Sequence, residues 1–214
     1  MDYVRLGSFL LDISKSLAGA FFGAAAAFGA NQLLQHQRRR REDRAAGNLA
    51  IFILSTHFNT AHLLQRELAP YRRNAPQMPP LEHVLAPPTI IDLKTLSFLI
   101  EVGEGQLLGE IRVAEDTFLA AVDALQKRNK FHIDEIQPAF EKAGFVIGRP
   151  VCRQAVDDAL GQRKLGLLIS SSEHVLNLID SASEKLLAAG EKLHAAIQKE
   201  FPRAKIVIQF SAVD

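Results

Sequence analysis

The sequence predicts an all-α protein, with an N-terminal transmembrane helix followed by an antiparallel bundle of long helices and a short extended C-terminal tail. Three observations predict this architecture. An uncharged, mostly apolar run covers residues 17–34, a block of arginines follows it, and apolar residues recur at helical spacing through most of the remaining chain. Helical spacing of this kind is typical of elements that bury one face, and only residues 205–210 read as a strand.

The run from Leu17 to Leu34 is the candidate membrane span. A bilayer core of about 30 Å needs roughly 20 helical residues, and this run contains no charged side chain. Apolar residues upstream allow a tilted helix from about Val4 to Leu34, with Lys15 reaching the headgroups. One alternative is an Ala-rich helix buried in a soluble bundle. Another is a signal peptide, although its positive charge should precede the apolar run rather than follow it.

Five arginines follow the run and predict its orientation: Arg38, Arg39, Arg40, Arg41 and Arg44. Because basic flanks stay on the cytoplasmic side, we expect a single-pass protein of a bacterial inner membrane, with its N-terminus outside and its C-terminal domain cytoplasmic. The arginines also suit anionic lipid headgroups. Nucleic acid is a weaker interpretation, because no aromatic residues alternate with the arginines and the rest of the chain is acidic.

Small side chains form one face of the candidate span. Gly19 and Gly23 stand four residues apart, and Ala20, Ala24 and Ala27 continue the same face. In lipid, such a face lets two helices approach closely. We therefore expect that Gly19 and Gly23 contribute to a homo-oligomer.

The chain divides into residues 1–34, which hold the span, and residues 35–214, which form a helical-bundle domain. Residues 70–89 carry six of the nine prolines and predict a semi-rigid surface linker within that domain. The expected helices cover residues 42–68, 90–101, 106–143 and 151–200, and the first of these can be continuous with the span and is stopped by Pro70. Thr89 and Asp92 form a capping-box-like start for the second, and Pro138 should kink or restart the third.

The sequence gives no convincing catalytic, cofactor-binding or metal site. His132, Asp134 and Glu135 lie close together, but no second histidine follows at metal-ligand spacing. A cleft that gathered these three residues against another charged helix would favour an enzyme. The single cysteine, Cys152, excludes an intrachain disulfide and is typical of a reducing cytoplasm. Its position between Arg149 and Arg153 at a helix start makes a reactive thiol conceivable, but an inert cysteine is the simpler interpretation.

Three short stretches carry a resemblance at the level of layout: Gln37–Glu42, Thr95–Ile100 and Glu135–Phe140. With these stretches in this order, the chain resembles uncharacterised bacterial single-span inner-membrane proteins with a helical cytoplasmic domain. The resemblance implies the same topology and no activity.

These observations predict a membrane-anchored scaffold, sensor or regulatory interaction protein. Its expected partners are the lipid bilayer, a second copy of the chain and an unidentified protein. The alternative is a pore-forming or membrane-disrupting effector of the toxin or phage-defence type. In that case the Gly/Ala-rich span would self-associate, and Asn31 and Gln32 would supply a polar lining.

Overall fold

The computed structural model describes residues 3–81, 88–145 and 153–202. Within these ranges, it describes the side chains of all residues except 3–20, Pro76 and Arg153. Every regular element among the described residues is helical, which confirms the predicted all-α class. The predicted extended tail at 205–210 and Cys152 lie outside the described residues.

The chain forms two compact units, residues 1–45 and 46–214. The first helix, α1 (Tyr3–Leu68), begins in the first unit and ends in the second. It ends at the predicted place, because Pro70 lacks the amide hydrogen that a further helical turn would need. The chain continues there as a short 3₁₀ turn, η1 (Ala69–Tyr71).

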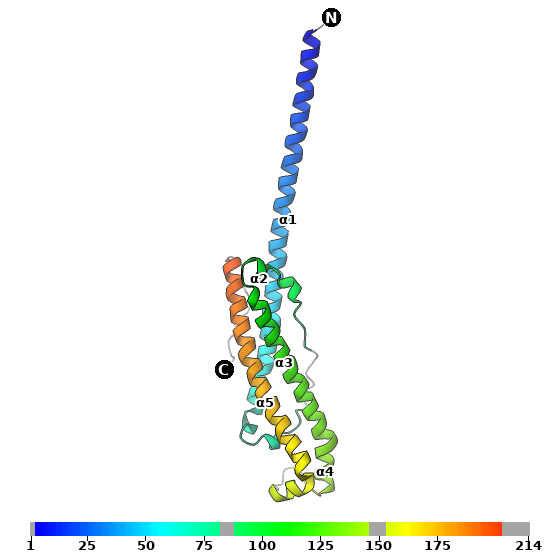
Figure 1. The fold of residues 1–214 in the computed structure, drawn as a ribbon, viewed down its shortest axis with the longest axis vertical. Coiled ribbons are helices and arrows are strands. Elements are labelled where there is room, and N and C mark those ends of the chain that lie inside the picture. The colour runs from blue at the N-terminus through cyan, green and yellow to red at the C-terminus, as the bar shows by residue number, and fades with distance from the viewer. Residues whose placement is uncertain (1–2, 82–87, 146–152, 203–214) are drawn as a thin grey trace. The chain divides into compact units, whose positions relative to one another are not determined.

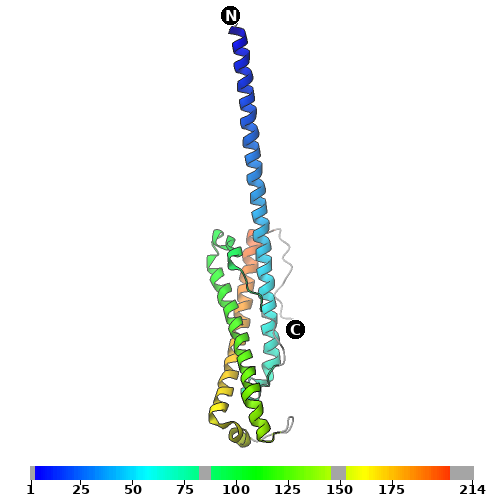
Figure 2. The same cartoon turned by 90° about the vertical axis from the view of Figure 1, so that its right-hand side faces the viewer.

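Three helices form the bundle of the second unit: the C-terminal part of α1, α3 (Gly105–Phe131) and α5 (Arg153–Glu200). They lie side by side in Figures 1 and 2. α5 runs antiparallel to α3, since Lys192 pairs with Glu110 and the later Lys199 pairs with the earlier Glu104. The main core between the helices includes Ile51, Leu54, Leu99, Ile111, Leu186 and Leu193.

α1 and α3 run in the same direction. His57 of α1 stacks on Phe118 of α3, and further along both helices Leu64 and Leu125 share a second core cluster. The antiparallel packing predicted for the long helices is therefore wrong for this pair, although α5 does run antiparallel to both. The reason is the length of the proline-rich segment. At up to about 3.3 Å per residue, residues 72–91 can pass along the whole of a helix of roughly 35 Å.

That segment is more buried than a surface linker. It contains η2 (Ala75–Gln77), and the side chains of Ala75 and Met78 lie in the second core cluster. The predicted helix over 90–101 is reduced to η3 (Leu93–Leu96) and α2 (Phe98–Glu101). Asp92 caps η3 by accepting a hydrogen bond from the Lys94 backbone N–H at 3.0 Å. Thr89 therefore does not begin this helix.

Pro138 restarts the third helix, as predicted. α3 passes into a π-helical turn, η4 (His132–Ile136), and then into α4 (Gln137–Lys142), with Pro138 in the first turn of α4. A π turn before a proline accommodates the missing i→i−4 hydrogen bond. Gly144, with φ of +74°, ends α4 in the left-handed conformation.

α5 contains a break that the sequence analysis did not predict. Gly161 has φ of 67° and ψ of 160°, which is not helical, so residues 153–160 and 162–200 form two helical segments. Only glycine adopts this backbone conformation without strain.

Candidate functional site

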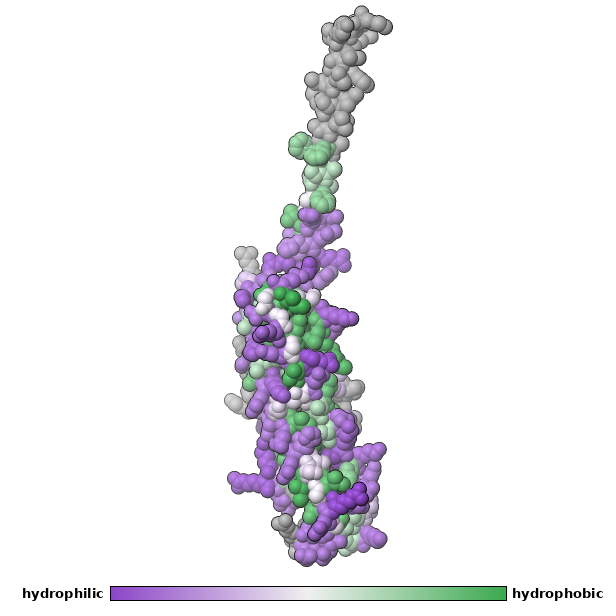
Figure 3. Space-filling model, in the orientation of Figure 1, coloured by the Kyte–Doolittle hydropathy of each residue, from purple (hydrophilic) through white to green (hydrophobic). Residues whose placement is uncertain are grey.

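The candidate membrane segment exposes its large apolar side chains. Phe21, Phe22 and Phe28 are 72 %, 73 % and 65 % exposed, and Leu33 and Leu34 are similarly open. Phe21 and Phe22 pack edge to face, with ring centroids 6.3 Å apart. Figure 3 shows the apolar part of this segment in green, followed by a purple polar stretch. The rings that sequence analysis placed in lipid are therefore exposed in the part of the chain that the structure describes.

A search of the described helices finds no stretch that is both long enough and apolar enough to cross a membrane. The predicted span begins at Leu17, and the side chains of residues 17–20 lie outside the described ones. Gly19 is among these residues. Gly23 is described, and a Cβ added there would meet no atom within 4 Å.

The five predicted flank residues, Arg38, Arg39, Arg40, Arg41 and Arg44, are all exposed. Arg38 donates to Glu42 at 2.8 Å in an exposed i,i+4 pair. Such a pair contributes about 0.3–0.5 kcal/mol, so it does not keep the guanidinium from a lipid phosphate.

The histidines that the structure describes do not gather into a metal centre. In the part of the chain that the structure describes, no three His, Cys, Asp or Glu side chains are placed to hold a metal ion. His62 stacks on Phe58, with ring centroids 5.9 Å apart. Burial and the positive charge of Arg128 lower the pKa of His132 from its ordinary value of 6.5 to about 4.

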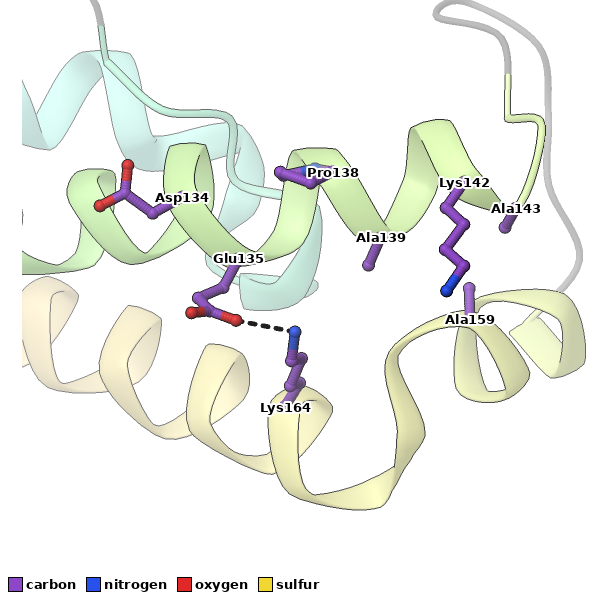
Figure 4. A pocket seen from close by; sticks show the side chains of 8 residues that line it. All are labelled: Asp134, Glu135, Pro138, Ala139, Lys142, Ala143, Ala159 and Lys164. Carbon is purple, nitrogen blue, oxygen red and sulfur yellow. Dashed lines mark ion pairs between the residues drawn. The ribbon is translucent and has the colours of Figure 1, made fainter.

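Asp134 and Glu135 do lie in a cavity, which has a volume of about 520 Å³ and is lined also by Lys142 and Lys164. Figure 4 shows the Glu135 side chain pointing toward Lys164 and the Asp134 side chain pointing away from Lys164. Glu135 Oε2 and Lys164 Nζ lie 2.7 Å apart. The hydrogen bond and charge of Lys164 lower the pKa of Glu135. His132 does not line this cavity. The arrangement that would have favoured an enzyme is therefore met only in part.

A buried arginine that sequence analysis missed holds one end of the proline-rich segment. Arg128 is 1 % exposed, and it donates to the backbone carbonyls of Pro79, at 2.8 Å, and Met78. It also donates to the Ser172 hydroxyl at 3.2 Å, which joins α3 to α5. Burial lowers the pKa of Arg128 to about 10. The guanidinium suits this position because its fork of donors can bind several carbonyls at once.

Asn129 fixes the same end of the segment. Its amide group donates to the Leu81 carbonyl at 3.0 Å and accepts from the Leu81 N–H at 3.4 Å. Nearby, Asp180 of α5 accepts hydrogen bonds from Arg72 and, at 2.9 Å, from Gln65. Together these side chains fasten residues 72–81 to the bundle.

Glu115 and His57 hold the other end of the segment. Glu115 is fully buried and accepts a hydrogen bond from the Ile91 N–H at 2.7 Å. Burial raises the pKa of this carboxyl group. His57 is buried against Phe118 and hydrogen-bonds the backbone of Thr89, and its burial lowers its pKa. Atoms Glu115 Oε2 and His57 Nδ1 are buried without a hydrogen bond.

These polar contacts left only faint signals in the sequence. Arg128 and Asn129 stand in a charged stretch that is typical of a solvated helix face, and Glu115 lies next to Asp116 in a similar pattern. The backbone groups that these side chains bind lie at least 24 residues away in the chain. Any residue type carries the same backbone groups, so the sequence does not indicate these contacts.

Comparisons of this chain with known protein families, with curated proteins and with solved structures find no match.

Proposed function

We propose that this chain is a membrane-anchored helical interaction protein, a scaffold, sensor or regulatory subunit of a bacterial inner membrane. Residues 1–34 enter the bilayer with the N-terminus outside, and the bundle lies on the cytoplasmic side. One observation carries the proposal. Phe21, Phe22 and Phe28 are exposed, whereas Leu54, further along the same helix, is fully buried.

The energetics favour an apolar environment around these rings. Burying a phenylalanine side chain is favourable by about 1.5–3 kcal/mol relative to leaving it in water. Contiguous exposed apolar surface is rare in monomeric soluble proteins and marks membrane or protein contacts. The arginines that follow, Arg38 to Arg41, then meet anionic headgroups, each contributing about 1 kcal/mol near the surface.

An interaction role suits the second unit better than a catalytic one. The cavity near Asp134 holds a carboxylate, Glu135, that is already neutralised by Lys164, and the half-buried His132 does not line this cavity. Two buried charged groups of the bundle, Arg128 and Glu115, hydrogen-bond the backbone of the proline-rich segment and of Ile91 just after it.

The test is fractionation of the full chain after expression in bacteria, with alkaline washing of the membranes. We expect the wild type to sediment with the membranes. The triple substitution of Phe21, Phe22 and Phe28 by Gln should release most of the protein. The matched control replaces Ile90, Ile100 and Val113 by Gln. These residues are 60 %, 63 % and 53 % exposed on the bundle, and the control should sediment as the wild type does. A wild-type chain found in the aqueous fraction would contradict the proposed membrane attachment.

Orientation is tested by reporter fusions at the C-terminus. The wild type should give cytoplasmic reporter activity, and replacing Arg38, Arg39, Arg40 and Arg41 by Glu should reduce or scramble it. Unchanged orientation would exclude the arginines as the topology signal. The pore alternative makes a different prediction for the same cells. Membrane potential would collapse when the intact chain is expressed, and would hold when residues 1–34 are deleted.

A further inference from the structure

The outer face of α1 within the bundle differs from the outer faces of the other two long helices. Residues 46–65 contain no Asp, Glu, Lys or Arg. The exposed positions of α3 include Arg112, Asp116 and Asp123, and those of α5 include Glu173, Glu184 and Lys185. A helix that faces water normally carries charged side chains on its solvent side. The outer face of α1 lacks them over more than five turns.

This face carries a regular stripe of exposed residues: Leu49, Phe52, Thr56, Asn59 and Leu63. They stand three, four, three and four residues apart, the spacing of a coiled-coil seam. Leu49, Phe52 and Leu63 are 59 %, 55 % and 52 % exposed. The Thr56 hydroxyl donates to the Phe52 carbonyl at 2.9 Å, so its hydrogen is used within the helix. We call these five residues the α1 stripe.

We propose that the α1 stripe is a homotypic interface, at which two copies of the chain pack α1 against α1. The absence of charge favours a second copy over a different protein. Different partners usually select each other through complementary charges, whereas a twofold contact sets the stripe against its own copy, and each residue lies near its own counterpart when the helices are parallel. An uncharged stripe avoids the repulsion that such a contact would otherwise create.

Asn59 adds a preference for register. Its side-chain amide carries donors and an acceptor, so it can pair with the same amide of a second helix when the two copies are in register. That pairing needs the two helices to be parallel. Parallel packing also follows if both copies enter the bilayer from the same side, so the orientation, but not the contact itself, rests on the proposed membrane attachment.

The contact is small. Twenty helical residues are about 30 Å long, and one face of them offers less than the roughly 800 Å² per partner of a standard interface. The pairing should therefore be weak in dilute solution. Attachment of both copies to one membrane raises their effective concentration and favours it.

Cysteine cross-linking of the full chain, purified in mild detergent, tests the proposal. Cys152→Ser removes the only native thiol. Thr56→Cys then places one thiol at the middle of the stripe, where it meets its counterpart in either orientation. Asp123→Cys, on the exposed face of α3, is the control. Mild oxidation should give a disulfide-linked dimer for Thr56→Cys and little or none for Asp123→Cys. Leu49→Cys should cross-link to itself only if the helices are parallel.

Substitutions separate this contact from other sources of dimerisation. Phe52→Glu should reduce cross-linking through Thr56→Cys about tenfold, the equivalent of 1.4 kcal/mol, whereas Val113→Glu, at a position of similar exposure (53 %) on α3, should not. Gly23→Leu places a large side chain on the small-residue face of the candidate span, and its effect on cross-linking tests whether the dimer depends on pairing there.

The proposal is overturned if Thr56→Cys stays monomeric, if Asp123→Cys cross-links equally, or if only Gly23→Leu abolishes the dimer. A monomeric Thr56→Cys chain would point to a different partner or to a segment of the same chain on the stripe. Membrane sedimentation is read separately, so failure of the anchor leaves this test intact.

Discussion

The carboxylate of Glu115 accepts a hydrogen bond at 2.7 Å from the backbone N–H of Ile91, which lies 24 residues earlier in the chain. This bond fastens the end of the proline-rich segment to the middle of α3. The second carboxylate oxygen, Oε2, makes no hydrogen bond and lies 3.8 Å from Nη1 of Arg112. A buried carboxylate that is half satisfied is stabilising through one oxygen and costly through the other.

Two substitutions of Glu115 separate these effects. Glu115→Ala removes the acceptor and leaves the buried Ile91 N–H without a partner, so the free energy of unfolding should fall by about 2 kcal/mol. Glu115→Gln keeps an acceptor and removes the buried charge, so the loss should be smaller. Chemical denaturation at pH 7 measures both. Equal losses for Ala and Gln would contradict the role of the Ile91 hydrogen bond.

The pH dependence of the Gln variant provides an independent check. Burial raises the pKa of Glu115 in the folded state above its ordinary value of 4.5. Between pH 4.5 and this raised pKa, the folded state therefore binds more protons than the unfolded chain. The contribution of Glu115 to stability is therefore present in full below pH 4.5 and is lost as the pH rises through the folded pKa. The stability of the wild type relative to Glu115→Gln should increase as the pH is lowered through this window. A constant difference would exclude a raised pKa.

Arg128 should be among the most sensitive positions of the bundle. Arg128→Met removes its hydrogen bonds to Ser172 and to the carbonyls of Met78 and Pro79, and we expect a loss of about 3 kcal/mol in the free energy of unfolding. Limited proteolysis within residues 72–91 should become faster. Lys127→Met is the control, since Lys127 is exposed and pairs with Asp123 one turn away, and it should change stability by at most about 0.5 kcal/mol. Similar losses for the two variants would contradict the role of Arg128.

His132 reports on the same buried region through its pKa of about 4. Because the unfolded chain binds a proton near pH 6.5, whereas folded His132 does not, the contribution of His132 to stability is present above pH 6.5 and is lost as the pH falls toward 4. NMR titration of the imidazole ring should give a midpoint far below 6.5. His132→Asn should remove part of the acid sensitivity of the bundle. A ring that titrates near 6.5 would show that neither burial nor Arg128 acts on it.

The fold class and several helix boundaries were predictable because they depend on local rules. Pro70 ends α1 and Pro138 restarts the third helix through the missing amide hydrogen, and the helical spacing of apolar residues indicated where helices form. The same spacing rules could not give the direction of α3. That direction depends on how far the segment around Met78 travels along the bundle, and its anchors, Arg128 and Glu115, bind backbone groups distant in sequence.

The candidate membrane segment shows a second limit of sequence analysis. Its composition predicted lipid around Phe21, Phe22 and Phe28, and their exposure is compatible with that prediction, which stays untested. The sequence analysis did not predict the α1 stripe, because helical spacing alone does not say which apolar residues of this helix are buried. Only the structure separates the buried side chains of this helix from the exposed ones.

Gly161 was missed because an isolated glycine inside a helical pattern does not reveal its backbone angles, and the same helix supplies a matched comparison at Gly166. A Cβ would meet no atom within 4 Å at either position, but Gly161 has φ of 67°, whereas Gly166 lies within the regular helix. Gly161→Ala forces an L-residue into a left-handed conformation and should lower the free energy of unfolding by about 1–2 kcal/mol. Gly166→Ala reduces the entropy of the unfolded chain and should raise it by up to about 1 kcal/mol. Thermal denaturation should therefore shift in opposite directions for the two variants. Stabilisation by Gly161→Ala would mean that α5 runs through this position without a break.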